Sequence, residues 1–177
     1  MKRTPIPPQE FIAEPHTLFA KRWFLLSCGD FEKRRFNHMT ISWGSLGTLW
    51  SLPVAMVVVR FSRFTFEFME KYDTFTLNSF PEKFHKELNI LGSKSGREID
   101  KIHPVGLAPI ASKLVKAPSF RQADLVLECK KIYWDDMNPA HFLEARIHDK
   151  YPTHDYHRIF LGEVLGIFGD EKYRKAT

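Results

Sequence analysis

Residues 60–65 read RFSRFT and follow directly on the apolar run at residues 52–59. Two guanidiniums, Arg60 and Arg63, and two hydroxyls, Ser62 and Thr65, therefore lie where a buried strand is expected to end and a helix to begin. Hydroxyls, a guanidinium fork and the free N–H groups of a first helical turn suit a dianionic phosphate. A helix capped by Ser62 or Thr65, with its arginines in solvent, fits the same residues, and spacing alone favours it.

A second cationic segment, SKSGREIDK at residues 93–101, places Lys94, Arg97 and Lys101 around Ser95 and Gly96. Glycine permits the close approach of an anion to the backbone, so this segment is another candidate for phosphate binding. The competing interpretation is a solvated loop in which the acidic residues of the segment neutralise part of its charge.

The third candidate is NHMTISWG at residues 37–44, where Met39, Ile41 and Trp43 alternate with Thr40 and Ser42. The polar face of such a strand could hydrogen-bond a flat heteroaromatic ring while Trp43 packs nearby. The alternation alone favours an ordinary strand with one face in the core.

Signatures of metal-dependent and nucleophilic catalysis are missing from the sequence. Histidines and aspartates gather between residues 135 and 157, but their spacing matches neither HExxH nor a short Cys/His zinc pattern, so we expect no metal site. GxSxG, Walker and GxGxxG sequences are absent too. This argues against hydrolases of that type and against a Rossmann-bound nicotinamide.

Composition and charge narrow the classes of partner. The net charge of +5 is spread along the 177 residues, which favours a local anion pocket over a nucleic-acid-binding stripe. Cys28 and Cys129 lie in apolar segments and are predicted to be reduced core residues of a cytoplasmic protein. No apolar stretch approaches the roughly 20 residues of a membrane span, and the N-terminus lacks the apolar region of a signal peptide. We therefore expect no nucleic-acid or membrane partner.

The elements that must position the candidate residues follow from hydrophobic periodicity and turn signals. Residues 1–17 contain four prolines and are predicted to form an extended N-terminal arm, and residues 18–177 a single domain. The glycine- and serine-containing residues 43–53 are predicted to be a loop. Helices are predicted at residues 66–72 and 81–92. Strands are predicted at residues 23–28, 36–43, 54–61, 73–80, 124–134 (half exposed) and 157–168, and the two glycines of the last strand permit a bulge or a close backbone approach. Antiparallel strands with inserted helices indicate a small barrel.

Six segments, in this order, resemble the flavin reductase-like, FMN-binding split-barrel family, and its flavoredoxin-type branch most closely. They are FNHMTISWG, WSLPVAMVVVRFSRFT, DTFTLNSF, LGSKSGREIDK, LVLECK and DYHRIFLGEV, and together they span about residues 17–168. The resemblance implies a mainly β fold, a six-stranded antiparallel split β-barrel of Greek-key type with short inserted helices. It also implies a homodimer that holds FMN non-covalently near the subunit interface.

The resemblance further implies which residues contact FMN. The MTISWG strand would run along the isoalloxazine ring, RFSRFT would hold the phosphate and ribityl chain, and SGREIDK would approach the cofactor. His157 would lie near the ring, where it or Lys101 would stabilise negative charge on the reduced flavin. The implied cofactor-binding residues are Thr40, Ile41, Ser42, Trp43, Arg60, Ser62, Arg63, Thr65, Asn78, Ser95, Arg97, Lys101 and His157.

Two activities fit this resemblance. One is NAD(P)H:flavin reduction, and the other is electron transfer in which a redox protein, such as an iron–sulfur protein, supplies the electrons. Because one architecture can host several ligands, a split-barrel binding module for haem or a pyridoxal-type phosphate is the alternative. Longer family members continue past the last strand, so we expect the flavin here to be more open, or covered by the partner subunit or the N-terminal arm.

Overall fold

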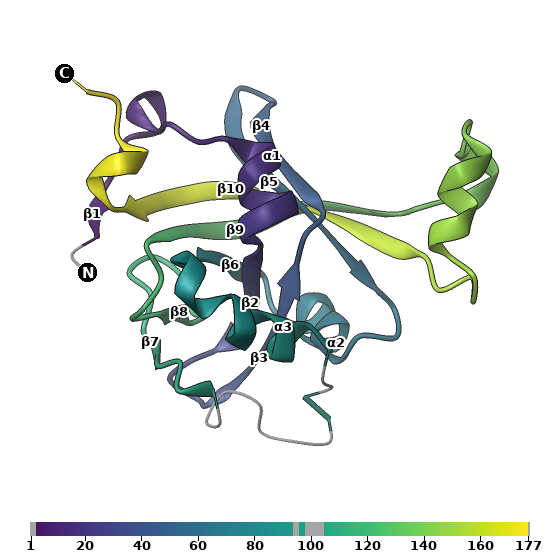
Figure 1. Cartoon of the computed structure of the whole chain (residues 1–177), viewed down its shortest axis with the longest axis horizontal. Helices are drawn as coiled ribbons and strands as arrows, with labels where there is room; N and C mark the ends of the chain where they lie inside the picture. The colour runs from purple at the N-terminus through teal and green to yellow at the C-terminus, as the bar shows by residue number, and fades with distance from the viewer. Residues whose placement is uncertain (1–2, 94–95, 98–104, 177) are drawn as a thin grey trace.

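The computed structural model describes residues 3–93, 96–97 and 105–176. Its body is an antiparallel sheet with the strand order β3-β2-β6-β9-β10-β5-β4, and β1 pairs with β10 (Figure 1). A separate two-stranded sheet joins β7 to β8. The strands are β1 (Thr4–Pro5), β2 (Phe24–Asp30), β3 (Arg35–Ile41), β4 (Gly44–Leu49), β5 (Leu52–Arg60), β6 (Thr74–Ser79), β7 (Pro109–Ile110), β8 (Ser119–Phe120), β9 (Leu125–Asp136) and β10 (His157–Gly169). The predicted mainly β, antiparallel architecture is confirmed.

Short helices pack against the sheet. α2 packs against β2, β3 and β5, and α3 packs against β3, so both predicted helices are confirmed. The helices and helical turns are α1 (Pro15–Thr17), α2 (Phe64–Lys71), α3 (His85–Ser93), and short turns at Pro8–Glu10, Leu18–Arg22, Glu82–Phe84, Pro139–His141, Ala145–Lys150 and Glu171–Tyr173. Within the part of the chain that the structure describes, no helix is long and apolar enough to cross a lipid bilayer.

The inner strands bury both of their faces. In β2, Phe24, Leu26 and Cys28 belong to the larger core cluster, whereas Leu25 belongs to a smaller cluster with Leu88 of α3. Burial on two faces explains why such strands are nearly continuous apolar runs in the sequence. Both cysteines are free and buried, as predicted.

Residues 43–53, predicted to be a loop, instead form most of the β4–β5 hairpin. Leu49 pairs with Leu52, so Trp50 and Ser51 form the two-residue turn, with φ of 51° and 59°. Tight hairpin turns usually have Gly or Asn at such positions. The residue types Trp and Ser therefore did not indicate a hairpin here. β4 is an edge strand with mostly exposed side chains, and it therefore tolerates glycine and serine.

The strand predicted to be half exposed, β9, is buried in its first part and exposed in its second. Residues 125–129 are all buried, including Glu128, whose carboxylate accepts the N–H groups of Lys113 and Leu114 (2.9 and 2.6 Å). Beyond them, β9 and β10 run out of the body of the barrel (Figure 1). Residues 137–156, which connect the two strands, project from the body at this end, and we call them the β9–β10 lobe.

The N-terminal arm packs on the barrel. Thr4 pairs with Gly169 of β10, and Ile6 is buried in the larger core cluster. Nearby, the fully buried carboxylate of Asp124 accepts hydrogen bonds from Arg22 Nη2 (2.6 Å), Lys172 Nζ (2.6 Å) and Tyr173 Oη (3.3 Å). Asp124 therefore ties the turn before β2 to the last turn of the chain.

The bulge predicted for the last strand is confirmed, because the register between β10 and β9 shifts at Gly162 and again before Gly166. A Cβ atom at Gly162 would lie 2.5 Å from Phe75 Cζ and 3.0 Å from the Cβ atom of Cys129. We expect Gly162→Ala to lower the free energy of unfolding by about 1–3 kcal/mol, since overpacking displaces buried neighbours. Urea unfolding measures this change, and Gly47→Ala, where a Cβ meets nothing within 4 Å, is the matched control. Equal stabilities of the two variants would contradict the prediction.

Candidate functional site

A pocket of about 440 Å³ lies where the ends of β3 and β5 meet the start of β10. It forms there because Gly44 pairs with Val57 and His157 pairs with Arg60, which brings Trp43 and the RFSRFT turn to the same place. Two of the three candidate motifs therefore share one pocket. Its lining residues are Met39, Thr40, Ile41, Ser42, Trp43, Val58, Arg60, Ser62, Arg63 and His157.

Ser62 presents two donors at the basic end of this pocket. Its hydroxyl donates to Asp155 Oδ2 (2.5 Å) and its backbone N–H donates to Asp155 Oδ1 (3.3 Å). Arg63, the N-cap residue of α2, follows directly, and no side chain caps the helix. The predicted capping of α2 by Ser62 or Thr65 is therefore wrong, because Ser62 bonds the β9–β10 lobe instead.

Arg63 and Arg97 connect the same turn to the neighbouring segments. Arg63 Nη2 donates to the carbonyl oxygen of Gly92 (2.5 Å) near the end of α3. Arg97 Nη1 donates to the carbonyl oxygen of Ser62 (3.1 Å), and Arg97 Nη2 pairs with Glu67 (2.5 Å). Arg97 thus lies beside the predicted phosphate turn, although it is not among the pocket-lining residues. Lys94, Ser95 and Lys101 of the same motif lie outside the described residues.

Arg60 holds the base of the β9–β10 lobe. Its Nη1 and Nη2 atoms donate to the carbonyl oxygens of Asp155 and Lys150, both at 2.9 Å. Its guanidinium carbon also lies 4.9 Å from the ring centroid of Tyr151. Both terminal nitrogens of Arg60 therefore have backbone partners. Of the two arginines that line the pocket, Arg63 has the greater capacity to donate hydrogen bonds to an anion.

His157 lies deep in the pocket. Its Nδ1 atom is 2.9 Å from Tyr151 Oη, and its ring centroid is 5.1 Å from that of Trp43. Burial, and then the nearby charges of Arg60 and Arg63, lower the pKa of His157 to about 4. The imidazole of His157 is therefore neutral near pH 7, and its role in stabilising negative charge on a reduced flavin stays a prediction.

The lowered pKa of His157 predicts a pH dependence of stability. The pKa in the folded chain lies below the ordinary value of 6.5, so the unfolded chain takes up the proton first as the pH falls. The stabilising contribution is therefore complete above about pH 6.5 and is lost as the pH falls toward about 4. We expect His157→Gln to lose less stability than the wild type between about pH 7 and pH 5 in urea unfolding. The exposed His141 provides the control variant His141→Gln, and an identical pH slope in all three proteins would contradict the prediction.

Besides Arg97, two predicted contact residues do not line the pocket. Thr65 is buried, and its hydroxyl accepts a hydrogen bond from Asn37 Nδ2 (2.9 Å) between α2 and β3. Asn78 is fully buried; its amide nitrogen donates to Leu25 O (3.1 Å) and Thr76 Oγ1 (2.9 Å), and its Oδ1 accepts from Phe120 N (3.2 Å). Both side chains therefore form hydrogen bonds with buried polar groups of the core. The alternation of polar and apolar residues along a strand does not show whether a polar side chain has such a partner or faces a ligand.

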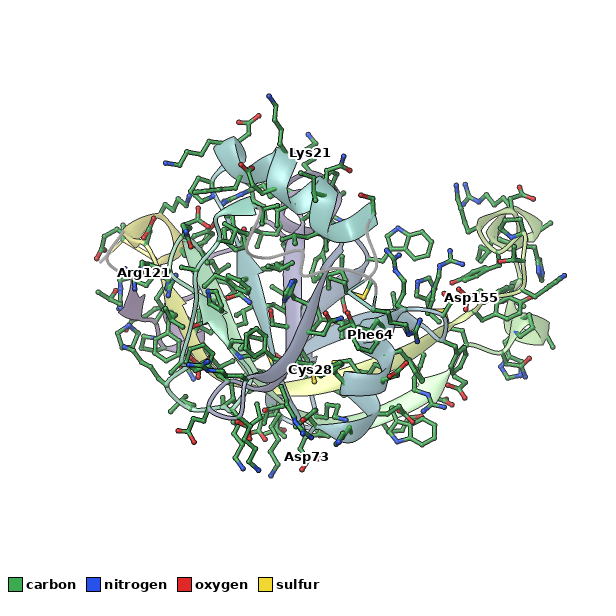
Figure 2. All side chains as sticks on the ribbon, turned by 90° about the horizontal axis from the view of Figure 1, so that it is seen from below. Lys21, Cys28, Phe64, Asp73, Arg121 and Asp155 are labelled. Atoms are coloured by element: carbon green, nitrogen blue, oxygen red, sulfur yellow. The ribbon has the colours of Figure 1, made fainter. Side chains whose placement is uncertain are left out.

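Asp155 and Tyr151 are site residues to which the sequence analysis assigned no role, although Asp155 begins the DYHRIFLGEV segment. Both belong to the β9–β10 lobe and reach the pocket through Ser62 and His157. Figure 2 shows Asp155 where the lobe joins the body. Among the described residues, no cluster of His, Cys, Asp or Glu is arranged to hold a metal ion.

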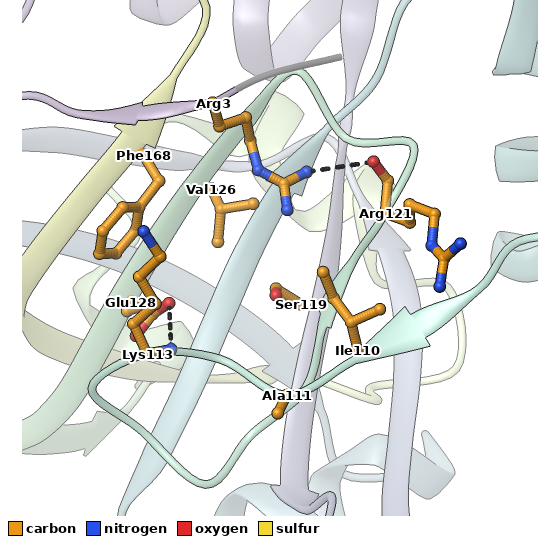
Figure 3. A pocket seen from close by; sticks show the side chains of 9 residues that line it. All are labelled: Arg3, Ile110, Ala111, Lys113, Ser119, Arg121, Val126, Glu128 and Phe168. Carbon is orange, nitrogen blue, oxygen red and sulfur yellow. Dashed lines mark hydrogen bonds between the residues drawn. The ribbon is translucent and has the colours of Figure 1, made fainter.

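A smaller cavity of about 200 Å³ lies elsewhere on the barrel (Figure 3). Figure 2 shows one of its lining residues, Arg121, on the opposite side of the molecule from Asp155. Two of the charged residues that line this cavity are engaged by the fold: Arg3 donates to the carbonyl oxygens of Phe120 and Ala123, and Glu128 accepts backbone N–H groups. The larger pocket is therefore the candidate site.

The fold and this pocket define a split-barrel protein whose cavity joins an aromatic wall to a basic, hydroxyl-bearing turn. A family model described as "Flavin reductase like domain" matches residues 17–176. The chain belongs to this family, which is one of flavin-binding oxidoreductases. The predicted recognition is confirmed.

Solved structures with the same fold cover nearly all of the chain. Flavoredoxin of Desulfovibrio vulgaris (Miyazaki F) has a TM-score of 0.66 at 22% identity, over 97% of this chain and 78% of that chain. An FMN-binding domain of a flavin reductase-like enzyme from Shewanella baltica OS155 has a TM-score of 0.69 at 19% identity, with the same coverage of 97% and 78%. At these identities the likeness establishes the fold, and the predicted split barrel is confirmed.

Sequence similarity adds one partial relative. An uncharacterized protein of Aquifex aeolicus (strain VF5) is 30% identical over 91 residues, which cover 51% of this chain and 38% of the relative. The matched stretch therefore spans well under half of that protein.

Proposed function

We propose that this protein is an FMN-dependent oxidoreductase that holds FMN non-covalently in the pocket between Trp43 and the RFSRFT turn. The observation that carries the proposal is the meeting of these two motifs in one cavity. Its volume of about 440 Å³ lies within the range of small-molecule and cofactor pockets. One end offers the hydroxyl and N–H of Ser62 and the guanidinium of Arg63, which suits a terminal phosphate. The other end offers the ring of Trp43, which suits a flat heteroaromatic group.

Different residues of the pocket bind the phosphate and the ring of FMN. Ser62 and Arg63 bind the phosphate, and the neighbouring positive end of α2 favours its charge. Residues 40–43 line the ring, and neutral His157 packs beside Trp43 and helps to exclude water. When bound, FMN supplies the redox chemistry, which is the transfer of hydride or of single electrons. No side chain is required as a general base.

Two electron donors are compatible with this site, NAD(P)H and a redox protein. Trp43 is 42% exposed, so the ring end of the pocket is open to a second molecule. The test begins with titration of FMN into the purified protein, followed by absorbance and fluorescence. The FMN-loaded protein is then mixed anaerobically with NADH, NADPH or a reduced iron–sulfur protein. Bleaching of the flavin by a nucleotide supports the reductase, and bleaching by the protein donor alone supports an electron carrier.

The same titration separates the proposal from its alternative. Haem and pyridoxal 5′-phosphate are titrated in parallel with FMN and riboflavin. Tighter binding of FMN than of the other ligands supports the flavin protein. Binding of haem or of pyridoxal phosphate without binding of either flavin would overturn the proposal and favour a binding module for another cofactor.

We also propose a cytoplasmic homodimer. Large apolar side chains remain exposed on the β9–β10 lobe, on β9 and in the β4–β5 turn, notably Leu143 (96%), Trp134 (54%) and Trp50 (59%), respectively. A second copy of the chain would cover such side chains. Sedimentation at several protein concentrations tests this proposal, and a monomer at all concentrations would contradict it. The cytoplasm is the proposed compartment because both cysteines are free and buried.

A further inference from the structure

We propose that Asp155 is an internal competitor for the phosphate-binding turn, and that binding of a phosphate group displaces it and loosens the base of the β9–β10 lobe. This inference rests on the proposed function for the identity of the phosphate, which is that of FMN. The competition itself concerns only the donors of Ser62 and the carboxylate of Asp155.

The carboxylate of Asp155 is bound in the manner of an anion ligand. Its two oxygens separately accept the hydroxyl of Ser62 (2.5 Å) and the backbone N–H of Ser62 (3.3 Å). The next residue, Arg63, is the N-cap of α2, so the carboxylate also lies near the positive end of a helix. A hydroxyl and a backbone N–H at a helix N-terminus are the donors that phosphate groups use.

A phosphate and Asp155 cannot use these donors together. The N–H and the O–H of Ser62 each carry one proton, so each makes one strong hydrogen bond at a time. A phosphate monoester also carries about −1.5 to −2 charges near pH 7, and it repels a carboxylate at contact distance. The phosphate of a ligand at this turn therefore requires Asp155 to leave it.

The departure of Asp155 affects the base of the β9–β10 lobe, which lies beside the pocket. The backbone carbonyl of Asp155 accepts Arg60 Nη1, and that of Lys150 accepts Arg60 Nη2, both at 2.9 Å. Tyr151, between them in sequence, contacts both His157 and Trp43 of the pocket wall. The lobe projects from the body and is attached to it at residues 150–155, where the side chain of Asp155 supplies two of the hydrogen bonds (Figures 1 and 2). Occupancy of the phosphate turn is thereby coupled to the mobility of the lobe.

An exposed hydrogen bond that merely anchors a loop is the competing explanation. It predicts that Asp155 affects only local order and leaves phosphate affinity unchanged. The two explanations differ in the expected phosphate affinity, since removal of a competitor strengthens phosphate binding whereas removal of an anchor leaves it unchanged.

The test compares Asp155→Asn with Asp149→Asn, which makes the same change of charge at an exposed aspartate of the same lobe. Inorganic phosphate, FMN and riboflavin are titrated into both variants and the wild type by calorimetry. We expect Asp155→Asn to bind inorganic phosphate and FMN about tenfold more tightly than Asp149→Asn does, with riboflavin unchanged. Hydrogen exchange of the amides at residues 150–156 is measured on the wild type with and without phosphate. We expect phosphate to accelerate this exchange in the wild type.

Each outcome decides one of the two proposals. Equal phosphate affinity in the two variants, or wild-type exchange that phosphate leaves unchanged, overturns the inference even if both flavins bind. Tighter phosphate binding by Asp155→Asn with no binding of either flavin supports the inference and overturns the proposed function. Failure of every variant to bind phosphate overturns the inference as well, because the turn would then be no phosphate site.

Discussion

Replacing Arg63 with alanine is expected to weaken FMN binding about ten- to a hundredfold and to leave riboflavin binding nearly unchanged. Arg63 lines the pocket beside Ser62, and its bond to the carbonyl oxygen of Gly92 (2.5 Å) holds the guanidinium in place. A hydrogen bond between a guanidinium and a phosphate contributes about 1.5–3 kcal/mol, which corresponds to this loss. Riboflavin lacks the phosphate, so its affinity separates loss of the ion pair from damage to the ring site. Calorimetric titration of both ligands measures the effect.

A control variant separates the specific effect of Arg63 from a change of overall charge. Arg146 is an exposed residue of the β9–β10 lobe that pairs with Glu144 at 3.7 Å, and Arg146→Ala makes the same change of charge away from the pocket. We expect this variant to bind FMN as the wild type does. Equal losses of FMN affinity in Arg63→Ala and Arg146→Ala would show that Arg63 acts only through the net charge of the protein, and would remove its phosphate-binding role.

Replacing Asp124 with alanine is expected to lower the free energy of unfolding by about 3–5 kcal/mol. The carboxylate is fully buried and accepts bonds from Arg22, Lys172 and Tyr173. Its removal leaves the guanidinium of Arg22, whose side chain is only 22% exposed, without its charged partner. Chemical denaturation at neutral pH, followed by tryptophan fluorescence, measures the change.

The matched control for Asp124→Ala is Asp149→Ala on the exposed surface of the β9–β10 lobe, for which we expect a change within about 0.5 kcal/mol. A second variant, Arg22→Met, removes the guanidinium but keeps an apolar side chain of similar length, so it tests the pairing from the other side. If Asp124 holds the two chain segments together, Asp124→Ala and Arg22→Met combined will cost less than the sum of their separate effects. Strict additivity would mean that the two side chains act independently.

Local patterns in the sequence were sufficient to predict most of the elements. The apolar run before Arg60 predicted β5, helical spacing predicted α2 and α3, and the two glycines of β10 marked its bulge. These predictions hold because burial of a strand or helix selects apolar residues at a fixed period along the chain. The β4–β5 hairpin was missed because Trp50 and Ser51 adopt a turn conformation for which they are not typical residues.

Local patterns along the chain are enough to give the order of most strands and helices, the family that this order resembles, and the two motifs that meet in the pocket. The partner of each polar side chain, in contrast, is set by the three-dimensional fold. Asn78 and Thr65 serve the core, Arg60 holds the lobe, and Asp155 rather than solvent faces Ser62. The physical reason is that these partners come from distant parts of the chain and meet only through strand register. Polarity and spacing indicate that a side chain needs a partner, but they do not specify which one it finds.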